Sequence, residues 1–198
     1  MAKFLSFVLF VTFVGYPSTY MTPKQISTRS VYNGRIFSVR IDTLDDGSHT
    51  YEREVIEHAG SAVIVPLFED GTVALARQYR HAAGETLLEL PAGRLEPGED
   101  PETAALRELE EEIGHRASTI EKLAEFYVSP GFLDEKMHLY LATGLTESAQ
   151  NLDHDEHIDI VRFPLDEAAQ KAREGEFHDA KTIIGLIFAR DRQRPVRS

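Results

Sequence analysis

The segment from Gly93 to Glu112 concentrates residues that could do chemistry. It carries eight carboxylates against two arginines. Carboxylate oxygens are the ligands that hard divalent cations prefer in proteins, so this segment could hold Mg²⁺ or Mn²⁺. A solvated acidic surface is the competing interpretation, and the spacing of the side chains bears on the choice.

One helix is predicted inside this segment. Asp100 followed by Pro101 is a strong helix start, because a carboxylate N-cap precedes proline at the first helical position. Good helix formers follow, and Gly114 supplies a stop. At about 100° per residue, one stripe of this helix is apolar and is expected to face the core. Its members are Leu106, Leu109 and Ile113.

A second stripe of the same helix is acidic and consists of Glu108, Glu111 and Glu112. Like charges at i, i+3 and i+4 destabilise a helix by about 0.2–0.5 kcal/mol per pair. A solvated helix normally alternates the sign of its charges to avoid this cost. The spacing therefore favours a bound cation, although spacing alone leaves a solvated acidic face open.

The segments around this helix must position it, and most of them have strand character. They are residues 34–42, 51–57, 61–68, 73–80, 86–93, 120–129, 136–145 and 158–165. Asp46-Gly47 and Asp70-Gly71 mark hairpin turns. Two further helices are predicted at 165–176, ending at Gly175, and at 180–193. This order is typical of a mixed, mostly antiparallel α+β or α/β/α sandwich rather than of alternating β-α-β units.

Composition excludes several classes of function. The 198 residues suffice for one ordinary domain, and the net charge of −12 argues against nucleic acid or stable membrane association as partners. The chain contains no cysteine, which excludes disulfides, thiolate nucleophiles and cysteine-based zinc sites. An anionic small substrate is compatible with this charge only if divalent cations mediate the encounter.

Residues 1–20 differ from the rest of the chain. An apolar run from Phe4 to Val14 has the length of the apolar region of a signal peptide and is short for a membrane span. A translation start at Met21 explains the segment equally well. We exclude residues 1–20 from fold reasoning and expect a cytoplasmic protein, with a signal or anchor as the alternative.

The acidic segment resembles the Nudix box, G-x5-E-x7-R-E-U-x-E-E-x-G-U. Gly93, Glu99, Arg107-Glu108-Leu109, Glu111-Glu112 and Gly114 occupy its fixed positions. His115 departs from it, because the family has an apolar residue at the last position. The resemblance implies a Nudix-type α/β/α sandwich at 61–198, preceded by a small N-terminal β region at 21–60.

The resemblance also implies roles for single residues. Glu108 and Glu112 would be the principal metal ligands, with Glu111 close by and bridging through metal or water. Ala92 would offer its backbone carbonyl, and Gly93 would let the backbone approach the metal closely. Arg107 would hold Glu111 or Glu99 through its bidentate fork.

Flanking segments resemble the ADP-ribose pyrophosphatase subgroup of this family. Pro130, in Ser129-Pro130-Gly131, lies sixteen positions after Gly114. By this resemblance Arg80 contacts a substrate phosphate and Glu135 approaches the terminal ribose. Arg53, Glu54 and His58 are expected to contact adenine or its ribose, with Phe37 as a weaker stacking candidate. The resemblance also implies a homodimer formed with residues 21–60, across which these contacts could be made.

A water nucleophile needs a general base, which the resembling subgroup takes from an acidic loop outside the box. Asp153, Asp155 and Glu156 lie in such a loop here. We choose Glu156, which lies two residues before Ile158, where the strand is expected to start.

The expected function is Mg²⁺- or Mn²⁺-dependent hydrolysis of ADP-ribose, or a related ADP-sugar, to AMP and ribose 5-phosphate. One alternative is a hydrolase of GDP-mannose or another nucleoside diphosphate sugar. Another is a nucleotide-sensing module that binds without cleaving. Such a sensor is expected to lack box carboxylates, and this sequence keeps all of them.

Overall fold

The structure is a computed structural model that describes residues 22–152, 154 and 156–193. The apolar segment 1–20 and the candidate bases Asp153 and Asp155 lie outside the described residues.

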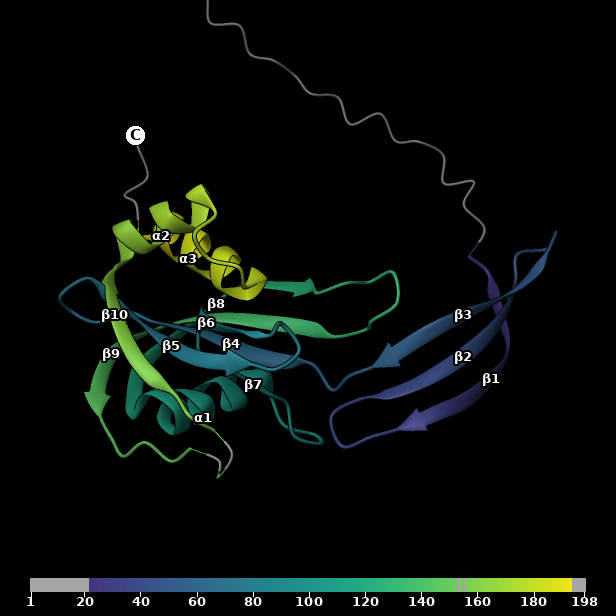
Figure 1. The fold of residues 1–198 in the computed structure, drawn as a ribbon, viewed down its shortest axis with the longest axis horizontal. Helices are drawn as coiled ribbons and strands as arrows, with labels where there is room; N and C mark the ends of the chain where they lie inside the picture. The colour runs from purple at the N-terminus through teal and green to yellow at the C-terminus, as the bar shows by residue number, and fades with distance from the viewer. Residues whose placement is uncertain (1–21, 153, 155, 194–198) are drawn as a thin grey trace, which may run out of the picture.

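Three antiparallel strands form an N-terminal sheet that projects from the rest of the chain (Figure 1). They are β1 (Lys24–Asn33), β2 (Ser38–Asp45) and β3 (Thr50–Glu57), in the order β1-β2-β3. We call residues 24–57 the arm. Every residue of β1 is exposed.

The first predicted strand, 34–42, is wrong at its start. The segment 34–37 is the turn between β1 and β2, closed by a hydrogen bond from the Gly34 amide to the Phe37 carbonyl (3.0 Å). Strand β1 was missed because its sequence, KQISTRSVYN, is mostly polar and lacks regular apolar alternation.

The remaining strands form two sheets in the body of the molecule. One has the order β7-β4-β9-β8, with β7 (Ala92–Arg94), β4 (Ser61–Pro66), β9 (Lys136–Glu147) and β8 (His115–Tyr127). The other has the order β10-β5-β6, with β10 (Asp159–Pro164), β5 (Thr72–Arg80) and β6 (Glu85–Glu89). In these two sheets β4 and β9 pair in parallel and the other neighbours pair antiparallel.

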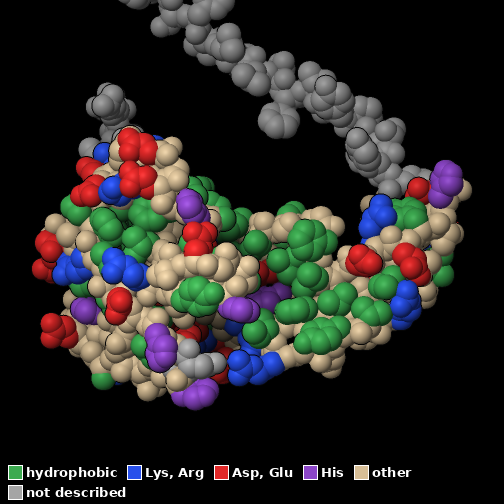
Figure 2. All heavy atoms as spheres, viewed as in Figure 1, with side chains coloured by type: hydrophobic (Ala, Val, Ile, Leu, Met, Phe, Trp, Pro, Cys, Tyr) green, Lys and Arg blue, Asp and Glu red, His purple; other side chains and the backbone are tan. Residues whose placement is uncertain are grey.

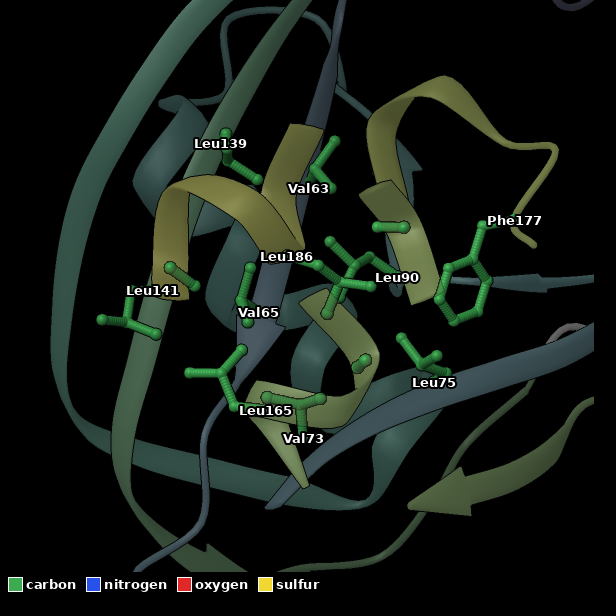
Figure 3. Close-up of a cluster of buried hydrophobic side chains, with 13 residues drawn as sticks. Val63, Val65, Val73, Leu75, Leu90, Leu139, Leu141, Leu165, Phe177 and Leu186 are labelled. Atoms are coloured by element: carbon green, nitrogen blue, oxygen red, sulfur yellow. The ribbon is translucent and has the colours of Figure 1, made fainter. Parts of the chain in front are cut away.

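Helices cover both faces of this body (Figure 1): α1 (Pro101–Ile113) on one, α2 (Leu165–Glu174) and α3 (Ala180–Arg192) on the other. Strand β4 divides the core, because all six of its residues are buried and they alternate between the two faces. Val63 and Val65 pack with Leu186 of α3 (Figure 3), while Ala62 and Ile64 pack with α1. The predicted fold class, a mixed and mostly antiparallel α/β/α sandwich with a small N-terminal β region, is confirmed.

Helix α1 begins and ends as predicted, but its buried face is different. Asp100 accepts hydrogen bonds from the Glu102 and Thr103 amides, and Gly114 takes the left-handed conformation (φ 69°). Leu109 and Ile113 are buried as expected, whereas Leu106 is 37 % exposed, so its placement in the core is wrong. The small side chains of Ala104 and Ala105 fill that part of the interface instead, because they let the helix lie close to β4.

The predicted strand 86–93 is in fact two strands. Strand β6 pairs with β5, and β7 pairs with β4, with Leu90 and Pro91 between them. Strand β8 starts at His115, directly after the helix and before the predicted strand at 120. His115 fits the turn because its ring meets the Phe68 ring edge-on at 5.1 Å. In the described part of the chain, no helix has the length and apolar character that crossing a membrane requires.

Candidate active site

A cavity of about 290 Å³ opens where β7, α1 and the loop after β9 meet. Its walls contain most of the residues that the Nudix box singles out. The residues that line it are Ala92, Gly93, Arg94, Glu96, Arg107, Glu108, Glu111, Glu112, Asn151 and Glu156. Glu156 is separated from α1 by more than forty residues in sequence, yet it faces the same space.

Glu112 is the most buried carboxylate of this cavity, at 5 % exposure. Burial, together with the charges of Glu108 and Glu156, raises its pKa to about 8. Burial also raises the pKa of Glu108, which is 9 % exposed. Buried carboxylates without a cation are costly to ionise, so this wall favours a positive charge.

Arg107 supplies a positive charge within the protein, and all five of its N–H groups have acceptors. Nε and Nη2 grip Glu99 as a fork (2.9 and 3.1 Å), and Nη1 donates to Glu108 (2.6 Å) and Glu111 (2.9 Å). Nη2 also donates to the Arg94 carbonyl (3.3 Å). Both expected partners, Glu99 and Glu111, are therefore bound by Arg107.

Gly93 lets the chain pass directly against a carboxylate. A β-carbon at this position would lie 1.8 Å from Oε1 of Glu108, so the Glu108 carboxylate would have to move away. The neighbouring Ala92 amide donates to Glu112 (3.2 Å), so two consecutive residues of β7 fix the two buried glutamates. Gly93 thus lies directly against the Glu108 carboxylate, and its expected approach to a metal stays a prediction.

The donor set fits a hard divalent cation, because the described residues of the cavity wall offer carboxylate oxygens and no sulfur or imidazole. Within the described residues, no three histidine or acidic side chains already converge on one point suited to a metal ion. Arg107 occupies Glu108 and Glu111 in this arrangement. Arg107 bonds one oxygen of each, Oε1 of Glu108 and Oε2 of Glu111, which leaves the other oxygen of each for a cation, and Glu112 has no bond to Arg107.

The loop that carries Glu156 is fastened to the end of α1. The Asn151 amide donates to the Glu111 carbonyl (3.0 Å), and Nε2 of Gln150 donates to the Glu112 carbonyl (2.6 Å). The Ser148 amide donates to the Gly114 carbonyl (2.7 Å). Helix carbonyls in the last turn have no partner within the helix, so these bonds satisfy them and hold the loop at the cavity.

A second cavity, of about 340 Å³, lies between the arm and the turn after β8. It brings together three of the predicted substrate contacts: Arg53, Glu54 and Pro130. The Arg53 guanidinium lies 4.4 Å from the centre of the Tyr51 ring and donates to the Glu52 carbonyl (3.0 Å). His58 and Phe37 line a different cavity at the base of the arm.

Two predicted substrate contacts are engaged within the protein. Nε and Nη2 of Arg80 both donate to Glu89 (2.8 Å each), and Lys181 of α3 also pairs with Glu89. Glu135 accepts from the Ser61 hydroxyl (2.8 Å) and lies 3.5 Å from Nδ1 of His58.

Sequence reasoning missed Arg94, which lines the cavity, and two residues that hold neighbouring segments together, Gln150 and Glu89. Arg94 directly follows the first glycine of the box, and this adjacency could have drawn attention to it. Nothing in the local sequence indicates that Gln150 meets α1 or that Glu89 is 2 % exposed, since both depend on contacts between distant segments.

Comparisons with known proteins agree with this geometry. The model of the NUDIX domain matches residues 58–184. The chain is 39 % identical to the methanol dehydrogenase activator of Bacillus methanolicus over 168 residues, which are 83 % of this chain and 91 % of that protein. It is 35 % identical to the ADP-ribose pyrophosphatase of Bacillus subtilis (strain 168) over 168 residues, with the same coverage of 83 % and 91 %.

A solved structure described as an ADP compounds hydrolase superposes with a TM-score of 0.75 at 26 % identity. The match covers 85 % of this chain and 92 % of the other. The resemblance to the ADP-ribose pyrophosphatase subgroup is thus confirmed, and the chain belongs to the Nudix family of hydrolases, enzymes that act on a pyrophosphate.

Proposed function

We propose that the protein hydrolyses the pyrophosphate of ADP-ribose, or of a related ADP-sugar, to AMP and ribose 5-phosphate with Mg²⁺ as its cofactor; Mn²⁺ could replace it. The observation that carries this proposal is the cavity itself, in which Glu108, Glu111, Glu112 and Glu156 share one space beside Gly93. The similarity to an ADP-ribose pyrophosphatase supports the choice of substrate.

Glu108, Glu112 and Glu111 would hold the cation, together with the Ala92 carbonyl. When bound, a divalent cation would neutralise charge on the pyrophosphate and make water more acidic. Arg107 keeps Glu108 and Glu111 in place through its hydrogen bonds. Burial and neighbouring carboxylates raise the pKa of Glu112, and a bound cation would lower it again because a cation favours the ionised carboxylate. This supports a cation beside Glu112.

Glu156 is the proposed general base. The oxygen of a water molecule forms a bond to one phosphorus, and the bond from that phosphorus to the bridging oxygen breaks. The bridging oxygen leaves with the other phosphate, and Glu156 accepts the proton of the water. Its loop is attached to α1 through Gln150 and Asn151, which supports a placement beside the reacting group.

The adenosine part is proposed to bind along the arm, at Arg53, Glu54 and Pro130, with His58 as a further contact. The second cavity offers apolar and charged walls in the same place, which suits a base and its ribose. Arg80 stays the expected contact to a substrate phosphate, and Glu135 the expected contact to the terminal ribose. We propose in addition that two chains associate through their arms, residues 21–60 forming the dimerisation region.

A substrate panel tests this function. Purified protein is incubated with ADP-ribose, other ADP-sugars and GDP-mannose, each with Mg²⁺ in ¹⁸O-labelled water, and the products are identified by mass spectrometry. We expect ADP-ribose to give the highest kcat/KM, with AMP and ribose 5-phosphate as products and the label on one of them. Preference for GDP-mannose would replace the substrate assignment, and binding without cleavage would favour a nucleotide sensor.

A further inference from the structure

Arg94 stands out because of the bonds that it does not make. Of the described residues that line the catalytic cavity, two are cations, Arg94 and Arg107. All five N–H groups of Arg107 are taken by Glu99, Glu108, Glu111 and the Arg94 carbonyl, as described above. Arg107 therefore has no donor left for a substrate phosphate.

Arg94 uses only one of its three nitrogens. Its Nη1 donates to the Arg35 carbonyl (2.6 Å) and, at 3.5 Å, reaches the Ile36 carbonyl in the turn between β1 and β2. Among the residues that the structure describes, no carboxylate pairs with Arg94, and Nε and Nη2 have no acceptor. Three N–H groups thus remain for a ligand.

Arg94 is held both by its backbone, in β7, and by its side chain, which bonds to the arm. It ends β7 directly after Gly93 and lies opposite Ser61 in the pairing of β7 with the buried strand β4. The bond from Nη1 to the arm restrains the side chain, so little ordering remains to be done when a ligand binds. Arg94 also connects the arm to the cavity, because it is bonded to one and lines the other.

The cavity is strongly acidic, so a cationic side chain would help the proposed metal ion to attract an anionic substrate. The described part of the cavity wall contains the five carboxylates Glu96, Glu108, Glu111, Glu112 and Glu156, which repel an anionic pyrophosphate. Arg80, the phosphate contact expected from resemblance, is held by Glu89 through two bonds of 2.8 Å and does not line this cavity.

We propose that Arg94 is a substrate-binding residue that grips a phosphate oxygen of the nucleoside diphosphate sugar with Nε and Nη2, while Nη1 holds the turn of the arm. This inference rests on the proposed function. The side chain that binds the phosphate is then also hydrogen-bonded to the turn of the arm. Binding of the phosphate and docking of the arm thereby stabilise each other.

Two substitutions separate phosphate binding from a purely structural tether. Arg94→Gln keeps an N–H donor for the arm carbonyls but loses the charge, and Arg94→Lys keeps the charge but loses the fork. Arg116→Ala is the matched control, because this exposed arginine is committed to Glu110 outside the cavity and its loss changes the net charge equally.

The readouts are calorimetric binding of the α,β-methylene analogue of ADP-ribose with Mg²⁺, and KM and kcat with ADP-ribose. We expect Arg94→Gln to weaken analogue binding and raise KM about tenfold to a hundredfold, with a smaller change in kcat. Arg94→Lys recovers part of this loss, and Arg116→Ala behaves as the wild type. Amide hydrogen exchange in residues 34–37 reports whether the hydrogen bond between residue 94 and the turn of the arm survives in each variant.

Analogue affinity and KM like those of the wild type in Arg94→Gln, with the wild type active, would overturn the inference and leave the proposed function intact. An equal loss in Arg94→Gln and Arg94→Lys that follows the hydrogen exchange of the arm would also overturn it, because the tether alone would then explain the effect. A wild type that neither binds the analogue nor cleaves ADP-ribose would overturn both proposals.

Discussion

Gly93 has no room for a side chain while Glu108 keeps its position. A β-carbon there would overlap the Glu108 carboxylate at 1.8–2.4 Å, and the three atoms nearest to it all belong to this side chain. Because the obstacle is the end of a flexible side chain, Glu108 can move aside without unfolding the protein. The absence of a side chain at Gly93 therefore matters more for the arrangement of the carboxylates than for the stability of the fold.

Gly93→Ala should accordingly separate activity from stability. We expect kcat/KM for ADP-ribose to fall about tenfold to a hundredfold, the range typical of a displaced group around a metal site. The thermal midpoint should change little, as measured by differential scanning calorimetry. Activity equal to that of the wild type would show that the position of Glu108 does not matter for catalysis.

At the scale of elements, two contacts join segments that lie far apart in the sequence. The loop after β9 is fixed to the end of α1 by Gln150, and β5 and β6 are joined to α3 by Glu89. The first contact concerns the rate of reaction, and the second concerns stability.

Gln150→Ala removes the side-chain bond to the Glu112 carbonyl (2.6 Å) and loosens the loop that carries Glu156. A single bond of this kind contributes about 0.5–1.5 kcal/mol, so we expect kcat to fall about twofold to tenfold while KM stays near that of the wild type. Steady-state kinetics with ADP-ribose measure this. Gln170→Ala, an exposed glutamine of α2 bonded to Glu174, is the control. A rise in KM with kcat preserved would contradict the proposed role of the loop.

Glu89 should make stability depend on pH. Burial favours the protonated acid, but the hydrogen bond from Arg80 and the charge of Lys181 outweigh it, so the pKa of Glu89 lies below its ordinary value of 4.5. A lowered pKa in the folded state stabilises the protein above the unfolded-state pKa, and this contribution disappears as the pH falls through the folded-state value.

Glu89→Gln should therefore lower the free energy of unfolding by about 3 kcal/mol at pH 7, because it breaks a buried charge network. The difference from the wild type should shrink as the pH falls below 4.5. Urea unfolding at several pH values measures it. Glu85→Gln is the control on the same strand, since Glu85 is exposed and its partner His178 lies 3.5 Å away. A difference that stays constant with pH would refute this account.

Local patterns predicted most of these elements. Asp100-Pro101 and Gly114 gave the bounds of α1 because caps act through neighbouring residues, and the same holds for α2 and its Gly175. The burial of Leu106 was mispredicted because Ala104 and Ala105 already fill the contact with β4. Strand β1 was missed because it forms by pairing with β2, and not because of its own sequence pattern. The box residues were found by resemblance, whereas Arg94, Gln150 and Glu89 become visible only when distant segments meet.

At the scale of the whole molecule, the arm lacks a partner for its apolar side chains. Those that stay exposed are Ile26 (55 %), Val31 (49 %), Tyr32 (52 %), Ile36 (56 %) and Phe37 (40 %). Figure 2 shows hydrophobic side chains gathered along the arm and the adjoining part of the body. Exposed apolar side chains gathered in this way are typical of an interface, and a second copy of the chain is the partner that we propose.

Light scattering after size exclusion should therefore give about twice the chain mass of 22.3 kDa. Ile26→Asp combined with Val31→Asp should shift the protein toward the monomer, because unpaired charges are costly in an apolar interface. Thr50→Asp, which adds charge at an exposed position of β3, serves as the control. A wild type that remains monomeric at micromolar concentration would disprove the dimer.

The most direct test of the central claim compares two glutamates of one helix. Glu112 lies in the cavity at 5 % exposure, whereas Glu110 points away from it and pairs with Arg116. With ADP-ribose and Mg²⁺, Glu112→Gln should lower the rate of AMP release about a hundredfold or more, and Glu110→Gln should retain the rate of the wild type. Equal rates in all three proteins, or AMP release by the wild type that continues unchanged when EDTA removes divalent cations, would contradict the account.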